Sequence, residues 1–238
     1  MRNSIRQLAQ LTFLTIIVAM TAMVAAAQTD TGTVTINGSV GKAASLRWYS
    51  FTNLNSTSGT NAPNTQNSPL SFTLNVGDVS PNNTNSYVGG TVTVILRTNS
   101  NYTLSAQVTA SSGFGAAGNT NGDIALTDIG FGLTNLASSG SGSLVTSTAV
   151  SGSSFAGSFG NNPSAAAKNA DGIPSFTTTL NNISAATQVL SGPRISKGGG
   201  LTSPNNGLLV DTNYTIGPQF FNATGNFSAT ITYTLATP

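Results

Sequence analysis

The chain contains no cysteine, no histidine and no glutamate among its 238 residues. Without cysteine it has no disulfide, no thiol nucleophile and no thiolate ligand for a metal. Without histidine it lacks the side chain that most often acts as a general base near neutral pH. A domain of this composition must be held together by its apolar core and by sheet hydrogen bonds.

Charged residues are also scarce, because Asp, Lys and Arg together make up only 6% of the chain. A typical soluble domain has roughly 25%. Beyond residue 27 six basic residues balance six acidic ones, which leaves no basic face for nucleic acid or anionic lipid. Thr, Ser, Asn and Gly replace the charges. Such a surface repels copies of itself only weakly, so it suits either an assembled surface protein or a generic extracellular β domain.

The first 27 residues have the layout of a secretory signal peptide. Arg2 and Arg6 precede an apolar stretch over residues 8–25, and three alanines at residues 25–27 provide small side chains for cleavage. The alternative is an uncleaved membrane anchor, because the stretch approaches the length of a bilayer. We predict cleavage after Ala27, a secreted or cell-surface location (through the periplasm in a Gram-negative host), and no membrane span in the mature chain.

The remaining 211 residues, 28–238, are expected to form a single all-β domain. Apolar residues alternate with Thr, Ser and Asn in several short segments, which is the pattern of half-buried strands. The clearest of these segments are residues 33–40, 71–76, 92–97, 102–108 and 227–235. Turn-rich spacers between them favour an antiparallel sandwich or barrel.

Asn, Pro and Gly mark long loops, and one region is harder to interpret. The expected loops are residues 53–68, 80–86 and 198–207. Residues 138–172, rich in Ser, Gly and Ala, could be a mobile hairpin or a long insertion on one sheet. The only helical signal beyond the leader is a single turn at residues 165–168.

A weak metal candidate lies at Asn121, Asp123 and Asp128, where oxygen side chains surround a glycine. Calcium prefers six to eight such oxygen ligands. The loop that flanking helices would present needs a bidentate Glu, which the chain lacks. The favoured interpretation is a turn leading into a strand at residues 123–126, with no metal and no cofactor.

Neither catalysis nor sugar binding has a strong signature. Paired carboxylates could hydrolyse glycosides, but six scattered Asp residues show no local pairing, so we predict no catalytic residues and no enzyme. Trp48 and Tyr49 lie in the densest aromatic cluster and could stack on a sugar, as in a carbohydrate-binding module. A strand with Trp48 in the core is the favoured alternative.

Both ends of the domain resemble subunits of the chaperone–usher pilin superfamily, including its spore-coat-U-like branch. The resemblance lies in residues 32–46, which begin GTVTINGSV, and in residues 225–235, GNFSATITYTL, about 26 residues in all. Ala44 stands about where the family has its first cysteine, and three residues follow Leu235 where the family's closing Tyr would be near the last residue.

This resemblance implies an immunoglobulin-like antiparallel β-sandwich, with long Ser, Gly and Asn-rich loops, that lacks one strand. It also implies that a neighbouring subunit's N-terminal segment fills the resulting groove, by addition of a strand to an exposed sheet edge. The strand-exchange candidates are Val34, Ile36 and Val40 at the N-terminal end, and Phe227, Ile231 and Tyr233 at the C-terminal end. The expected partners are further copies or other surface subunits, with a glycan as an alternative ligand.

Overall fold

The computed structural model describes residues 35–57, 66–116, 122–140, 144–203, 205–222 and 225–238. It divides the chain into two units, Met1–Val40 and Gly41–Pro238. In the first unit the described residues, 35–40, are exposed and belong to no strand. The described part of the half-buried strand expected over residues 33–40 is therefore not formed, because residues 35–40 pair with no sheet. The leader over residues 1–27 lies outside the described residues.

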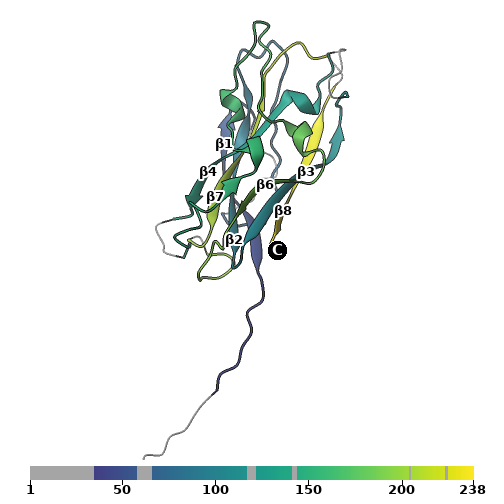
Figure 1. The fold of residues 1–238 in the computed structure, drawn as a ribbon. Helices are drawn as coiled ribbons and strands as arrows, with labels where there is room; N and C mark the ends of the chain where they lie inside the picture. Colours follow the sequence, from purple (N-terminus) through teal and green to yellow (C-terminus); the bar gives the residue numbers. More distant parts are fainter. Residues whose placement is uncertain (1–34, 58–65, 117–121, 141–143, 204, 223–224) are drawn as a thin grey trace, which may run out of the picture. The chain divides into compact units, whose positions relative to one another are not determined.

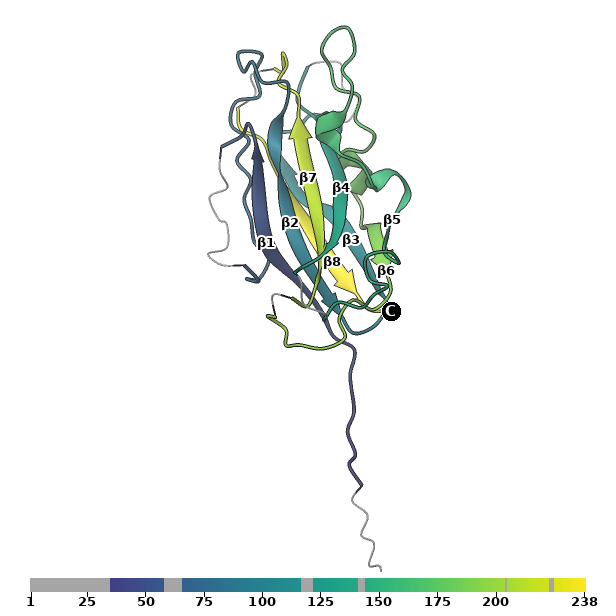
Figure 2. The same cartoon turned by 90° about the vertical axis from the view of Figure 1, so that its left-hand side faces the viewer.

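Within Gly41–Pro238, the described residues form two antiparallel four-stranded sheets (Figure 1). The first sheet has the order β1-β2-β7-β4, which Figure 2 shows face on. Its strands are β1 (Ala44–Leu54), β2 (Val88–Thr98), β7 (Leu208–Ile216) and β4 (Ile129–Ser138). The second sheet has the order β5-β6-β3-β8. Its strands are β5 (Ser154–Phe155), β6 (Thr187–Gly192), β3 (Tyr102–Ser112) and β8 (Ser228–Ala236). The all-β expectation is confirmed.

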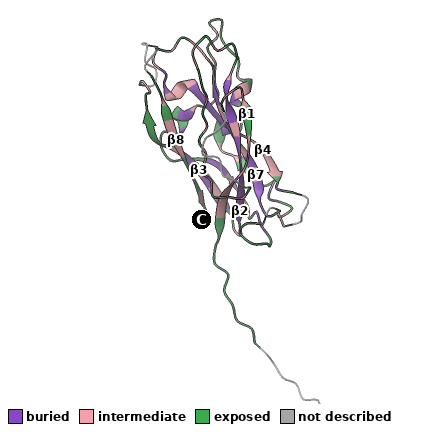
Figure 3. Cartoon of the chain, turned by 180° about the vertical axis from the view of Figure 1, so that it is seen from behind, coloured by how far each residue is buried: buried purple, intermediate pink, exposed green. Residues whose placement is uncertain are grey.

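One hydrophobic core lies between the two sheets. Leu96 of β2 and Val210 of β7 enter it from the first sheet, and Leu104 of β3 and Leu190 of β6 enter it from the second. All four are fully buried, and each contributes about 1.5–3 kcal/mol by burial. In Figure 3, β2 and β7 are buried along most of their length, whereas β8 has only partly buried and exposed residues.

Part of the long segment between β4 and β6 (the insertion) lies against the first sheet, whereas another part, β5, pairs with β6 in the second sheet. Phe131 of β4 donates its N–H to the carbonyl of Thr178 at 3.0 Å, so the insertion covers the edge of β4. A side chain at Gly132 would meet the carbonyl oxygen of Asn161 at 2.3 Å, which shows how closely the insertion lies against this strand. The first sheet is thus covered beside β4.

The short helical turns correct two expectations. Residues 123–126 do not form a strand, because the Asp128 carboxylate accepts the N–H of Ala125 at 2.8 Å and closes the 3₁₀ turn η1 (Leu126–Asp128). The turn expected at residues 165–168 lies earlier, as η3 (Pro163–Ala165), where Asn162 caps Ser164 at 3.1 Å. The other turns are η2 (Gly157–Phe159) and η4 (Leu180–Ile183). In the described part of the chain no helix is long and apolar enough to cross a bilayer.

Candidate functional site

Strand β8 forms an open edge of the second sheet. In the described residues it pairs with β3 alone, so the backbone groups of its other edge are available to a further strand. Its side chains alternate strictly between partly buried and exposed. Ala229, Ile231 and Tyr233 pack against the core, whereas Thr230 and Thr232 face outward. β8 therefore has one apolar face and one free backbone edge.

The other sheet ends are better protected. The edge of β4 is covered by residues 178–179, and the edge strand β5 has only two residues. Near the start of β1, Trp48 donates its N–H to the carbonyl of Ser68 at 3.0 Å, and Asn67 donates to the carbonyl of Trp48 at 2.9 Å. Among the described edges, β8 is the long one without such cover.

A groove of about 1180 Å³, lined by both apolar and polar residues, runs along β8. Its second wall is the segment of residues 70–79, which follows the part of the chain that pairs with β1. Along this wall the side chains alternate, with Phe72, Leu74 and Val76 partly buried and the residues between them exposed. The groove floor is formed by residues of the first sheet, from β1, β2, β4 and β7. Its apolar lining includes Leu46, Val92, Val94, Ile129, Leu180, Ile216, Phe227 and Ile231.

The segment of residues 70–79 explains why the groove stays open. The sequence predicted a strand at residues 71–76, and the alternation of that strand is present. Among the described residues the segment makes one isolated bridge, between Asn75 and Thr57, and belongs to neither sheet. Consequently the two walls of the groove do not hydrogen-bond to each other as neighbouring strands, and apolar side chains of both line a common opening.

A pair of tyrosine hydroxyls lies in the lining of this groove. The hydroxyl oxygens of Tyr214 on β7 and Tyr233 on β8 are 2.6 Å apart. Burial raises the pKa of both hydroxyls, and for Tyr233 the pKa lies well above its usual value. Both therefore stay neutral, and the groove carries no charge at this point.

The described N-terminal candidates, Ile36 and Val40, are exposed and belong to no strand. Ile36 is 91% exposed and Val40 is 92% exposed, the two highest values among the large apolar side chains of the described residues. Val34, the third candidate, lies outside the described residues. Exposed apolar side chains at alternate positions lose free energy to water unless another surface covers them. The segment can therefore serve as one half of a strand-addition pair.

Trp48 offers no free face to a sugar. The residue is only 8% exposed, and its ring stacks on Phe72 with centroids 5.2 Å apart and an interplanar angle of 12°. Phe51 also packs on Phe72, with ring centroids 4.9 Å apart. Tyr49 is half-buried at a β-bulge between Trp48 and Ser50. The aromatic cluster joins β1 to the groove wall instead of presenting a flat binding surface.

The described metal candidates make hydrogen bonds within the protein, Asp128 to its own turn and Asp123 to a residue far along the chain. Asp123 accepts a hydrogen bond from the Asn222 side chain at 3.0 Å, and Asp128 closes η1 as described above. Burial raises the pKa of Asp128, and its hydrogen bond to the Ala125 N–H opposes this shift. Asn121 lies outside the described residues. Among those described, no group of three or more His, Cys, Asp or Glu side chains is placed to hold a metal ion.

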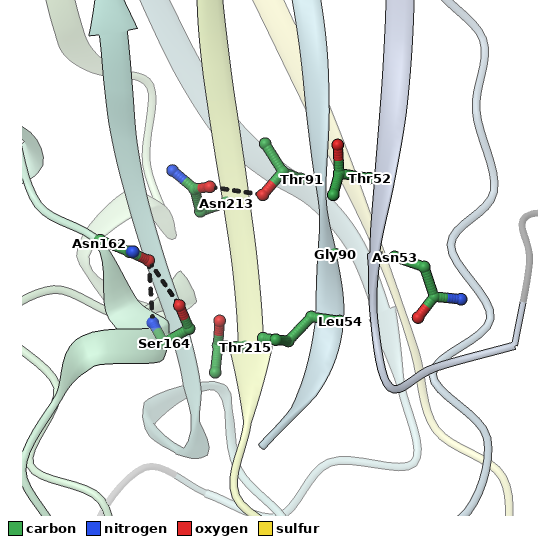
Figure 4. A pocket seen from close by; sticks show the side chains of 9 residues that line it. All are labelled: Thr52, Asn53, Leu54, Gly90, Thr91, Asn162, Ser164, Asn213 and Thr215. Carbon is green, nitrogen blue, oxygen red and sulfur yellow. Dashed lines mark hydrogen bonds between the residues drawn. The ribbon is translucent and has the colours of Figure 1, made fainter. Parts of the chain in front are cut away.

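A second, smaller pocket of about 110 Å³ lies on the outer face of the first sheet (Figure 4). It is lined by uncharged polar side chains, and Thr91 donates to the Asn213 side chain at 2.7 Å across it. The insertion contributes Asn162 and Ser164. Ligand pockets usually measure about 300–1,000 Å³, and this lining has no group that titrates near neutrality. The pocket suits bound water better than a substrate.

Comparison with models of known protein families, with curated proteins and with solved structures finds no match to this chain. The groove and its two walls are therefore the main guide to function. Sequence reasoning singled out Phe227, Ile231 and Tyr233, which all line the groove. It missed Tyr214 and the role of residues 70–79 as a wall. The alternation in that wall was visible, but it indicated a paired strand.

Proposed function

We propose that this protein is a secreted, non-enzymatic structural subunit of a cell surface, which assembles into fibres by strand addition. The exposed N-terminal segment of one copy would enter the groove of the next and pair with the free edge of β8. The observation that carries the proposal is the coexistence of an open groove beside the free edge of β8 with an exposed segment whose large apolar side chains, Ile36 and Val40, share one face of an extended chain. Strand addition needs both parts.

The period of the segment fits the groove. Residues 34, 36, 38 and 40 share one face of an extended chain, and in this sequence they are Val, Ile, Gly and Val. The opposite face carries Thr35, Asn37 and Ser39, which matches the hydroxyl-rich outer face of β8. The added strand would continue both surfaces of the sheet.

The energetics require both side chains and backbone. Burying three branched side chains contributes roughly 5–9 kcal/mol, whereas association costs about 4–15 kcal/mol. Backbone hydrogen bonds to β8 add about 0.5–1.5 kcal/mol each. The apolar face alone therefore barely offsets association, and the free edge of β8 supplies the rest.

The chemistry of the groove supports a structural role over catalysis. The chain has no His, Cys or Glu, and the one ionisable carboxylate in the groove lining is Asp78 at its margin. Asp78 accepts the N–H and the hydroxyl of Ser80, and these bonds hold its pKa below its usual value. It is thus a turn residue that stays ionised, with no second acid beside it in the lining.

The test compares the mature protein with variants of its N-terminal segment. Residues 28–238 should form oligomers whose size grows with concentration in size-exclusion chromatography and fibres in electron microscopy. Removal of residues 28–40 should leave a folded monomer that binds a synthetic peptide of residues 28–41. A strictly monomeric mature protein, together with an unfolded truncation, would overturn the proposal.

A matched pair of substitutions separates the groove-facing side from the outer side. Ile36→Asp places a charge on the face that enters the groove, so assembly should be lost because burial of an unpaired charge is costly. Thr35→Asp places the same charge one residue away on the outer face, so assembly should persist. Equal loss in both variants would point to net charge instead of strand addition.

A further inference from the structure

The sequence contains three Asn-Gly pairs, at residues 37–38, 121–122 and 206–207. Such pairs can react without an enzyme. The backbone nitrogen of the glycine attacks the side-chain amide carbon of the asparagine, and ammonia leaves to give a cyclic imide. Water then opens the ring to aspartate or isoaspartate. Glycine favours this reaction because it has no side chain to hinder its nitrogen.

The structure separates two of these pairs sharply. Asn37 and Gly38 are exposed and belong to no strand, and a side chain at Gly38 would meet no atom within 4 Å. Asn206 is only 4% exposed, and the N–H of Gly207 donates to the Ser139 hydroxyl at 3.0 Å. A side chain at Gly207 would lie 2.2 Å from the Ile95 side chain. The third pair includes Asn121, which lies outside the described residues.

We propose that Asn37 is a site of spontaneous deamidation that limits how long a free subunit remains able to assemble. The inference rests on the proposed function, because Asn37 lies in the segment assigned to strand addition. Isoaspartate inserts one extra main-chain carbon between Ile36 and Gly38. The two-residue period is then broken, so Ile36 and Val40 no longer lie on one face of an extended chain. Conversion also adds a negative charge.

Assembly would protect the same residue. In a strand the extended backbone and its hydrogen bonds hold the Gly38 nitrogen away from the Asn37 side-chain carbon. The reaction would therefore proceed in free subunits and slow down in assembled ones. Subunits that fail to assemble in time would lose their competence, whereas a completed fibre would keep its asparagine.

The experiment incubates fresh mature protein at mildly alkaline pH and follows each Asn-Gly peptide by mass spectrometry. Asn37 should convert, and Asn206 should react at least about tenfold more slowly, because reaction there requires local opening of the fold. Protein assembled before incubation should retain Asn37. Equal rates at Asn37 and Asn206, or equal rates in free and assembled protein, would overturn the inference.

The consequence for assembly is measured with Asn37→Gln, which retains an amide but forms the corresponding ring far more slowly. Each protein is compared with its own fresh sample. Aged wild type should lose assembly in proportion to its isoaspartate, and aged Asn37→Gln should lose none. Aged wild type that assembles like fresh protein despite conversion would refute the inference. Fresh wild type that never assembles would instead refute the proposed function. Selective conversion at Asn37 is measured by mass spectrometry of the peptides, so this part of the test does not depend on assembly.

Discussion

The hydroxyl of Tyr214 lies 2.6 Å from the hydroxyl of Tyr233, and this contact links the two sheets through the lining of the groove. Tyr214 belongs to β7 and Tyr233 to the edge strand β8. Thr212 of β7 also interacts with both hydroxyls, so the three side chains form a small polar cluster in the groove lining. The pair holds β8 against the first sheet while leaving the outer edge of β8 unpaired.

Alkaline pH should therefore weaken the fold. Burial raises the pKa of Tyr102, which donates to Ser153, to about 12, and raises the pKa of Tyr214 and Tyr233 in the same direction from the usual 10.0. Above pH 10 the unfolded chain loses these protons while the folded chain retains them. Stability is thus full below pH 10 and falls as pH rises further, which urea unfolding at successive pH values measures.

Tyr233→Phe isolates the groove pair in the same measurement. At neutral pH it should cost about 0.5–1.5 kcal/mol through the lost hydrogen bond. Above pH 10 its stability should fall less steeply than that of wild type, because one buried ionisable group is gone. Parallel slopes for the two proteins would mean that Tyr233 ionises equally easily in the folded and unfolded chains.

Truncating Trp48 should destabilise the domain strongly. Trp48→Ala removes a buried ring and its stack on Phe72, which corresponds to about 3–5 kcal/mol. Trp48→Phe retains an aromatic ring and is the matched control, with a smaller loss. Thermal unfolding followed by circular dichroism measures both. A stable Trp48→Ala variant that has lost affinity for an oligosaccharide would instead favour the carbohydrate-binding alternative.

Arg97 is an unusual buried charge. It is 3% exposed, and in the described part of the chain its Nε and Nη1 atoms have no hydrogen-bond partner. Its Nη2 donates to the Asn67 side chain and to the Ser203 carbonyl. Burial lowers its pKa, and the nearby charge of Arg47 lowers it further.

Replacing Arg97 with a residue of similar length should therefore not harm the fold. Arg97→Met removes an incompletely bonded buried charge, so stability should stay unchanged or rise by about 1–4 kcal/mol. Arg47→Met is the control, because its guanidinium is bonded to the Asn67 carbonyl at 2.7 Å. A loss above about 1 kcal/mol in Arg97→Met would show that the two bonds of Nη2 outweigh the cost of burial.

The strands with one solvent-facing side could be predicted from the sequence. Alternation over residues 102–108 and 227–235 indicated β3 and β8 because each has a solvent-facing hydroxyl row. β4 and β7 gave no such pattern, since the insertion and neighbouring loops cover their outer faces as well. A strand buried on both faces need not show the two-residue period on which the prediction depends, although β2, which is buried along most of its length, retains it over residues 92–97.

The groove itself could be predicted only in part. The alternation in the sequence predicted β8, which forms one wall. The same alternation occurs in residues 70–79, which belong to neither sheet. Whether an alternating segment pairs with a neighbouring strand depends on the whole fold. Tyr214 could not be assigned to Tyr233 because they are 19 residues apart and lie on different sheets. Likewise, the exposure of Ile36 and Val40 depends on the absence of a partner for that segment among the described residues.

Cysteine cross-linking between two copies tests strand addition most directly, because the natural chain has no cysteine. Single variants Val34→Cys, Ile36→Cys or Val40→Cys are each mixed with Ile231→Cys, whose half-buried side chain packs against the core on the inner face of β8. Thr232→Cys, on the outer face, is the matched control. We predict a disulfide-linked pair for at least one N-terminal position with Ile231→Cys, abolished by excess peptide of residues 28–41. Cross-linking no greater than with Thr232→Cys at all three positions would contradict strand addition.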